Sequence, residues 1–119
     1  MWEIEFFTKD NGRCPATEFL DSLNKKTDLP YINNDLNQLA EHGFNLKRPQ
    51  VGTLGDGLYE LRTKTRNGQF RFIYFFFDKE IIVVTHGFPK KTKAINPSEI
   101  KLAKEYRQIY FDRKLGKRS

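Results

Sequence analysis

The stretch from residue 58 to 93 constrains the fold most, because it predicts three successive β-strands joined by tight turns. It is rich in the aromatic and β-branched residues that favour strands. Asn67-Gly68 lies between two strand-like runs and predicts a two-residue type I′ hairpin turn, since both central residues must take a positive φ. That turn would place Lys64 opposite Arg71 and Arg62 opposite Ile73.

Side chains alternate across a strand, so the hairpin register assigns each residue to one of two faces. The apolar face should pack on helices and carries Tyr59, Leu61, Phe70, Phe72, Tyr74 and Phe76. The other face, which we expect the helices to leave uncovered, carries Glu60, Arg62, Lys64 and Arg71, with Ile73 and Phe75 between them. Because an unpaired buried charge costs several kcal/mol, this face suggests a partner of opposite sign, such as a phosphodiester. The alternative is an ordinary sheet surface on which Glu60 pairs with the arginines.

His86 lies on the third strand, which we expect from Ile81 to Phe88 after a turn at Asp78-Lys79. A connection of two or four residues would place His86 opposite Arg71 on the charged face. A connection of three residues would reverse the alternation and send His86 to the core, so both orientations remain open.

The rest of the chain predicts a strand, three helices and one long connection. Apolar and polar residues alternate over Trp2–Phe7, which predicts a half-buried strand. Pro15 and Pro30 suit the first turns of two helices. We expect Asp28 to cap the second helix and Gly43 to end it. Residues 45–57 read as a loop, Asn96-Pro97 opens a last helix, and 113–119 should form a frayed basic tail. The sequence therefore predicts a single α+β domain over 1–119, in which a twisted, largely antiparallel sheet with an N-terminal strand packs on two helices, plus a C-terminal helix.

The charge is distributed unevenly between the two parts of the chain. Residues 1–46 hold 4 Lys/Arg against 8 Asp/Glu, a balance of −4, whereas residues 47–119 hold 17 against 7, a balance of +10. Such an asymmetry is typical of a chain that presents a basic half to nucleic acid, although charge also serves solubility.

Cys14 is the one cysteine, so neither a disulfide within the chain nor a thiolate zinc site is expected. Without an apolar run of membrane-spanning length or a signal peptide, we expect a cytoplasmic protein with no membrane partner.

The charged face carries groups suited to cleaving RNA without a metal or cofactor. Arg62 and Arg71 could stabilise the extra negative charge that develops when a 2′-hydroxyl attacks the adjacent phosphorus. His86 would add a side chain that transfers protons near neutral pH. No convincing general base is present, which suggests that something else must bend the RNA into an in-line geometry.

Three segments together resemble a known family. They are GLYELR at 57–62, FRFIYFF at 70–76 and THGFPKKTKAINPSEIKLAKEY at 85–106. In this order they resemble the phage-derived Gp49-like, HigB-type branch of the RelE/ParE toxin superfamily.

The resemblance implies a RelE-like fold and the toxin of a type II toxin–antitoxin system, a ribosome-dependent mRNA endoribonuclease that inhibits translation and growth. By motif it carries over Arg62, Arg71, Lys90 and Lys91. Arg62, Arg71, His86 and Lys90 are the expected catalytic residues, and the expected RNA- or ribosome-binding residues are Lys47, Arg48, Lys64, Lys91 and Lys93. Its partners would be mRNA, the ribosome and a HigA-like helix-turn-helix antitoxin that forms a hetero-oligomer with the toxin. A ParE-like gyrase inhibitor and an RNA-binding module without catalysis are the alternatives on the same scaffold.

Overall fold

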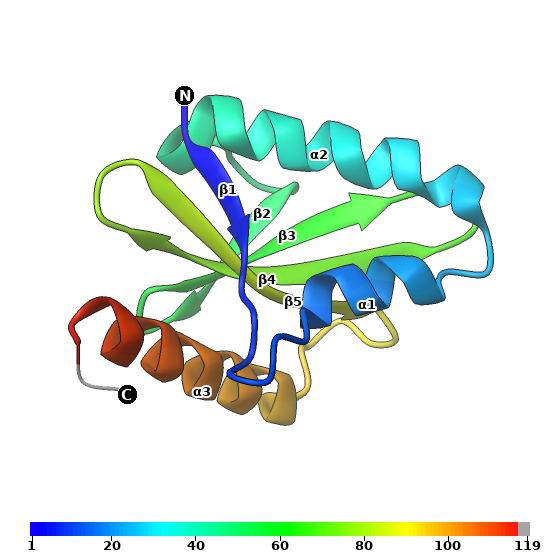
Figure 1. The fold of residues 1–119 in the computed structure, drawn as a ribbon. Helices are drawn as coiled ribbons and strands as arrows, with labels where there is room; N and C mark the ends of the chain where they lie inside the picture. Colours follow the sequence, from blue (N-terminus) through cyan, green and yellow to red (C-terminus); the bar gives the residue numbers. More distant parts are fainter. Residues whose placement is uncertain (117–119) are drawn as a thin grey trace.

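A five-stranded mixed sheet forms the centre of the protein in the computed structural model, which describes residues 1–116 (Figure 1). The strands are β1 (Glu3–Phe6), β2 (Val51–Gly55), β3 (Leu58–Lys64), β4 (Gln69–Phe77) and β5 (Ile81–Pro89), arranged in the order β1-β5-β4-β3-β2. β1 runs parallel to β5, and the other neighbours are antiparallel. This architecture confirms the predicted α+β class and is consistent with a RelE-like fold.

Three helices surround the sheet, each with a proline in its first turn, where the missing N–H costs nothing. They are α1 (Pro15–Ser22), α2 (Leu29–His42) and α3 (Pro97–Lys114), with short 3₁₀ turns η1 (Lys26–Asp28) and η2 (Gly43–Asn45) at either end of α2. The side chain of Asn96 caps α3 by accepting a bond from the backbone N–H of Ser98 at 2.9 Å, as predicted. Asp28 makes no side-chain cap, because its carboxylate accepts a bond from the Asn67 amide at 3.0 Å.

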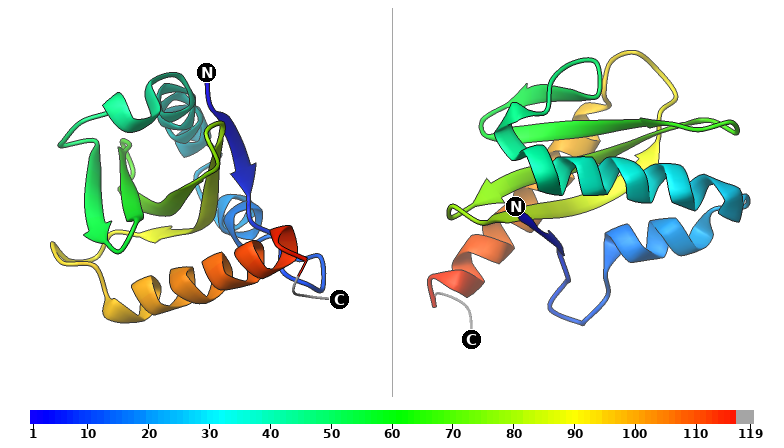
Figure 2. Two further views of the ribbon diagram at one scale, coloured as in Figure 1. Left: turned by 90° about the vertical axis from the view of Figure 1, so that its left-hand side faces the viewer. Right: turned by 90° about the horizontal axis from the view of Figure 1, so that it is seen from above.

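Helices cover both faces of the sheet (Figure 2). α1 and α2 pack on the predicted apolar face, where Leu61, Phe72 and Tyr74 are buried. α3 packs on the opposite face through Ala103, Tyr106 and Tyr110, which bury Ile73 and Phe75. The expectation that helices leave this second face uncovered is therefore wrong for the half that lies under α3.

The β3–β4 hairpin differs from its predicted register by two residues. Its connection is the four-residue loop 65–68, so Arg62 lies opposite Arg71 and Lys64 opposite Gln69. The Thr65 N–H donates to the Gly68 carbonyl at 2.8 Å, and the Thr65 hydroxyl accepts from the Asn67 N–H at 3.1 Å. Neither Asn67 nor Gly68 has a positive φ, so the type I′ turn does not form. Because the shift is an even number, every residue stays on its predicted face.

Two irregularities place His86. The β4–β5 connection has three residues, and a bulge at Thr85 then restores the alternation, so His86 pairs with Ile73 rather than with Arg71. His86 therefore lies on the charged face but under α3, where it is buried. The predicted pairing with Arg71 is wrong.

Two boundaries also differ from the sequence-based expectation. The predicted loop 45–57 contains β2, a short edge strand that pairs with β3. α3 continues to Lys114, and Arg113 bonds to Asp10 at 2.7 Å, so these first residues of the expected frayed tail are helical. The part of that tail at 117–119 lies outside the described residues. Within 1–116, no helix combines the length and apolarity needed to cross a bilayer.

Candidate functional site

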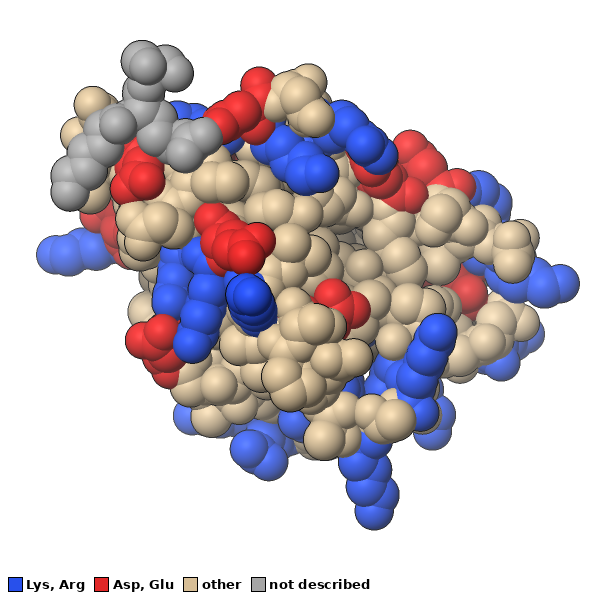
Figure 3. All heavy atoms as spheres, turned by 90° about the horizontal axis from the view of Figure 1, so that it is seen from below, with Lys and Arg blue, Asp and Glu red and all other residues tan. Residues whose placement is uncertain are grey.

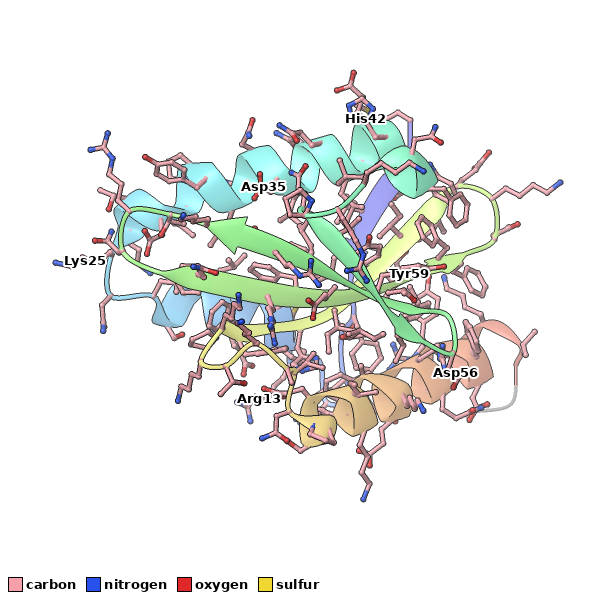
Figure 4. The ribbon with its side chains drawn as sticks, turned by 180° about the vertical axis from the view of Figure 1, so that it is seen from behind. Arg13, Lys25, Asp35, His42, Asp56 and Tyr59 are labelled. Carbon is pink, nitrogen blue, oxygen red and sulfur yellow. The ribbon has the colours of Figure 1, made fainter. Side chains whose placement is uncertain are left out.

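A groove of about 640 Å³ opens where β3 extends beyond the end of β2. Five cationic side chains line this basic groove, namely Arg62, Lys64, Arg71, Lys90 and Lys93. Asp35 of α2 lies at its upper edge in Figure 4, which views the molecule from the groove side. In Figure 3, Lys and Arg side chains project along the lower edge, which is this same side, whereas Asp and Glu gather mainly in the upper and middle parts.

Arg62 is the cation most firmly oriented in the groove. Its Nε donates to Glu60 Oε1 at 2.6 Å, and its Nη1 donates to the Pro49 carbonyl at 3.1 Å. Its guanidinium also rests against Gly52, where a Cβ atom would lie only 2.5 Å from Nη2. The side chain nevertheless remains 34% exposed. A fixed guanidinium that still reaches solvent can bind an anion without first being ordered.

Arg71 occupies a different environment, because its side chain is only 4% exposed. Its Nη2 donates to the carbonyl oxygens of Thr92 and Lys93, and its Nε lies 3.8 Å from Glu60 Oε2 without a hydrogen-bond partner. The guanidinium therefore fastens the basic loop 90–94 to the sheet. The prediction that Arg71 stands on an open surface is wrong, although the strand does bring it beside Arg62.

Glu60 explains how two arginines can lie opposite each other on neighbouring strands. Like charges in directly opposed positions are destabilising, but the buried Glu60 carboxylate faces both guanidinium groups. The pairing of Glu60 with the arginines, which the sequence left open, is therefore present. The triad of Arg62, Glu60 and Arg71 retains a net positive charge, and its exposed part is Arg62.

The remaining predicted cations fall into two groups. Lys64, Lys91 and Lys93 are exposed beside the groove, and Lys90 is held by its Nζ bond to Gln69 Oε1 at 3.3 Å. The backbone N–H of Lys90 also donates to the Gln69 carbonyl at 2.8 Å, which ties the basic loop to β4. Lys47 and Arg48 do not join this groove but line a separate pocket beside aromatic rings.

A comparison with protein families confirms the Gp49-like part of the resemblance that the motifs suggested. The family described as Phage derived protein Gp49-like (DUF891) matches residues 18–108, which include α2, the whole sheet except β1, and most of α3. The chain belongs to this family. Gp49-like proteins are a toxin-type family of the RelE/HigB-like superfamily, and such toxins act with an antitoxin partner. No curated protein matches the chain.

His86 of this Gp49-like protein is a buried histidine and not a groove residue. Its Nε2 lies 3.2 Å from Glu99 Oε1, and its Nδ1 lies 3.0 Å from the Thr85 hydroxyl. Burial lowers the pKa of His86, and the nearby Glu99 carboxylate opposes that shift. The imidazole therefore lies apart from the cations of the groove. It links β5 to α3 instead.

The lowered pKa of His86 predicts a dependence of stability on pH. Below the ordinary histidine pKa of about 6.5, the unfolded chain binds a proton that the folded chain resists. The free energy of unfolding should therefore fall as the pH drops through 6.5 and level off below the folded pKa. Urea denaturation between pH 7.5 and 5 measures this slope.

Replacement His86→Gln should flatten this slope, whereas the exposed control His42→Gln should leave it unchanged. An unchanged slope in His86→Gln would contradict the assignment.

Asp35 and Gln50 are among the groove residues that were not predicted from the sequence. Asp35 and Gln50 face each other across the groove edge, and Gln50 Nε2 donates to Asp35 Oδ1 at 3.2 Å. Burial raises the pKa of Asp35, while the nearby Thr63 hydroxyl and the Gln50 amide oppose that shift. Neither residue belongs to a motif, and their proximity depends on how α2 packs over β2, which the sequence pattern does not specify.

Proposed function

We propose that this Gp49-like protein is a HigB-type toxin, a ribosome-dependent mRNA endoribonuclease that inhibits translation and growth. The observation that carries the proposal is Arg62, a guanidinium held by Glu60 and the Pro49 carbonyl yet open to solvent, in a groove rimmed by lysines. A phosphodiester bound there would meet a fixed donor pair on its non-bridging oxygens. Exposed Lys64, Lys91 and Lys93 would hold neighbouring phosphates.

The reaction we propose uses the RNA as its own nucleophile. The 2′-hydroxyl oxygen forms a bond to phosphorus as its proton passes to water, and the P–O5′ bond breaks as the 5′-oxygen takes up a proton. The products are a 2′,3′-cyclic phosphate and a 5′-hydroxyl end. Arg62, with Lys90 beside it, stabilises the charge on the five-coordinate phosphorus. Arg71 contributes by holding the basic loop rather than by touching the phosphate.

The proposed dependence on the ribosome follows from the shape of the site. The groove is open and shallow and offers charge stabilisation, but it does not enclose a strand tightly enough to impose in-line geometry. Ribosome-bound mRNA would arrive already bent, so the groove itself would only need to stabilise the developing charge. Correct positioning of the reacting atoms can be worth about 7–11 kcal/mol of a barrier.

We further propose that the antitoxin partner is a HigA-like helix-turn-helix protein that forms a hetero-oligomer with the toxin. Acidic side chains on such a partner would complement the basic groove, and a bulky partner bound elsewhere would keep the toxin from the ribosome. Either arrangement would neutralise the toxin.

Induction of the protein in a bacterial host tests the proposed function. We expect translation and growth to stop and mRNA to be depleted, without a DNA-damage response. DNA-damage signalling with intact mRNA would instead support a gyrase inhibitor. Growth arrest with neither effect would support an RNA-binding module without catalysis.

Replacement Gly52→Ala provides a test of how Arg62 is positioned. A Cβ at residue 52 would lie within 2.5 Å of the Arg62 guanidinium, whose flexible end must then move. Since a misplacement of about 1 Å can cost about 100-fold in rate, we expect cleavage to fall at least tenfold with little change in thermal stability. The control Gly68→Ala lies in the neighbouring hairpin loop at a φ that is not positive, where a Cβ meets only the Phe70 ring at 3.8 Å. Equal activity of Gly52→Ala and wild type would contradict the role of Arg62 geometry.

A further inference from the structure

A second pocket, of about 390 Å³, lies between the C-terminal end of α2 and the β2–β3 hairpin. In Figure 4 it falls between the labelled residues His42 and Tyr59. Four aromatic rings line this aromatic pocket, those of Phe44, Tyr59, Tyr74 and Phe76. Its volume is within the range of small-molecule sites and exceeds what one nucleobase needs.

The rings are arranged in stacks with one accessible member. Phe44 stacks on Phe76 with ring centroids 3.8 Å apart and planes 28° apart, yet Phe44 remains 60% exposed. Tyr59 stacks on Tyr74 at 5.6 Å and 23°, and its ring meets Phe76 edge to face. The pocket therefore offers the exposed Phe44 ring and the half-buried Tyr59 ring for stacking, with the buried Tyr74 behind them. The exposed Phe44 ring adjoins three further aromatic rings, so it belongs to a cluster and is not an isolated surface residue.

Lys47 and Arg48 line the same pocket and are exposed. Among the residues that the structure describes, no acidic side chain lines it. Flat aromatic faces beside cations are the combination with which proteins bind single-stranded nucleic acid, because bases stack and phosphates pair with the cations.

The aromatic pocket adjoins the basic groove along the chain and at Gly52. Pro49 and Gln50 line the groove, and the next residues, Val51 and Gly52, line the pocket. Gly52 also supports the guanidinium of Arg62, so one residue separates the two sites. Along α2, eight residues separate Asp35 at the groove from Gly43 at the pocket, roughly 12 Å at 1.5 Å per residue. One strand of a few nucleotides can span both sites.

We propose that the aromatic pocket binds an unstacked base of the same single-stranded RNA whose phosphodiester occupies the basic groove, with Lys47 and Arg48 on the adjoining phosphates. The inference rests on the proposed function, because it extends the RNA path from the cleavage site. A base is favoured over an apolar protein side chain because two cations stand beside the rings and the neighbouring groove is basic. Lys47 and Arg48 then have a role in RNA binding although they lie outside the groove.

The proposal is tested by titrating a short RNA with the protein and measuring fluorescence. The RNA carries one 2-aminopurine as the fluorescent base and 2′-O-methyl groups that prevent cleavage. The full chain should quench the base as it stacks. Replacement Phe44→Leu keeps apolar area but removes the flat ring, and should abolish the quenching and weaken binding about tenfold, the scale of one base stack. The double replacement Lys47→Ala/Arg48→Ala should weaken binding and reduce its salt dependence. Leu115→Ala, at an exposed apolar residue on the far end of α3, is the control.

Unchanged quenching and affinity in Phe44→Leu would overturn the inference. The same would follow if Phe44→Leu left RNA binding intact but lost binding to an antitoxin, since the pocket would then be a protein-docking site. Failure of the base pocket can be distinguished from failure of the proposed nuclease function. If the wild type cleaves mRNA on ribosomes but Phe44→Leu binds RNA normally, the nuclease assignment holds and the base pocket is wrong.

Discussion

Replacement Arg62→Ala should lower ribosome-dependent mRNA cleavage by about 100- to 1,000-fold, the usual loss when one donor to a developing oxyanion is removed. Arg62 is the oriented cation that is still open to the groove, so no other side chain can take its place with the same geometry. Single-turnover cleavage on programmed ribosomes measures the rate. Arg62→Lys should recover only part of it, because an ammonium lacks the planar pair of donors.

Arg66→Ala is the matched control for this experiment. Arg66 is an exposed cation in the loop of the same hairpin and does not line the basic groove. It should change the rate less than threefold. Arg62→Ala should also lose some thermal stability, because the buried Glu60 carboxylate loses its 2.6 Å partner, so its rate is measured below its unfolding temperature. Full activity of Arg62→Ala would show that Arg62 is not a catalytic residue. Equal losses in Arg62→Ala and Arg66→Ala would show that Arg62 acts only through the overall positive charge.

Replacement Arg71→Met should destabilise the protein by about 1–3 kcal/mol for each polar group that loses its partner in the interior. The loss would leave the Glu60 carboxylate buried beside Arg62 alone and the Thr92 and Lys93 carbonyls without their donor. The basic loop should then loosen, so cleavage falls through structure and not through lost contact with phosphate. Urea denaturation measures the free energy of unfolding.

A double replacement separates this explanation from a simple packing defect. Arg71→Met/Glu60→Leu removes both buried charges, and should be more stable than Arg71→Met alone because Arg62, which is partly exposed, no longer has to offset the desolvation of Glu60 by itself. Stability of Arg71→Met within 1 kcal/mol of wild type would show that the guanidinium does not hold the loop. A double variant less stable than the single one would show that Glu60 is not the source of the cost.

The hairpin shows how far strand alternation can be predicted from sequence. Asn67-Gly68 identified the hairpin, but the Thr65 side chain and backbone close a four-residue loop instead of a two-residue one. The faces were predicted correctly because the register shifted by an even number of residues. The pairs of cations that lie opposite each other were not predicted correctly, because the pairing depends on the loop length and not on the alternation.

Burial at the site depended on parts of the chain that carry no pattern of their own. The carbonyls that enclose Arg71 come from the loop at Thr92 and Lys93, and backbone acceptors leave no trace in a sequence. The bulge at Thr85 likewise set the position of His86, and no residue type required it. β2 was missed because its glycines weaken the strand signal, although Gly52 is needed there to make room for Arg62.

Primer extension on a reporter mRNA incubated with the purified protein, with and without ribosomes, tests most directly whether the basic groove cuts RNA. We expect discrete truncated products with ribosomes, none without them, and none with Arg62→Ala. Cleavage that is equally strong in Arg62→Ala, or no cleavage by the folded wild type on translating ribosomes, would contradict the assignment of Arg62 and of the groove as the nuclease site.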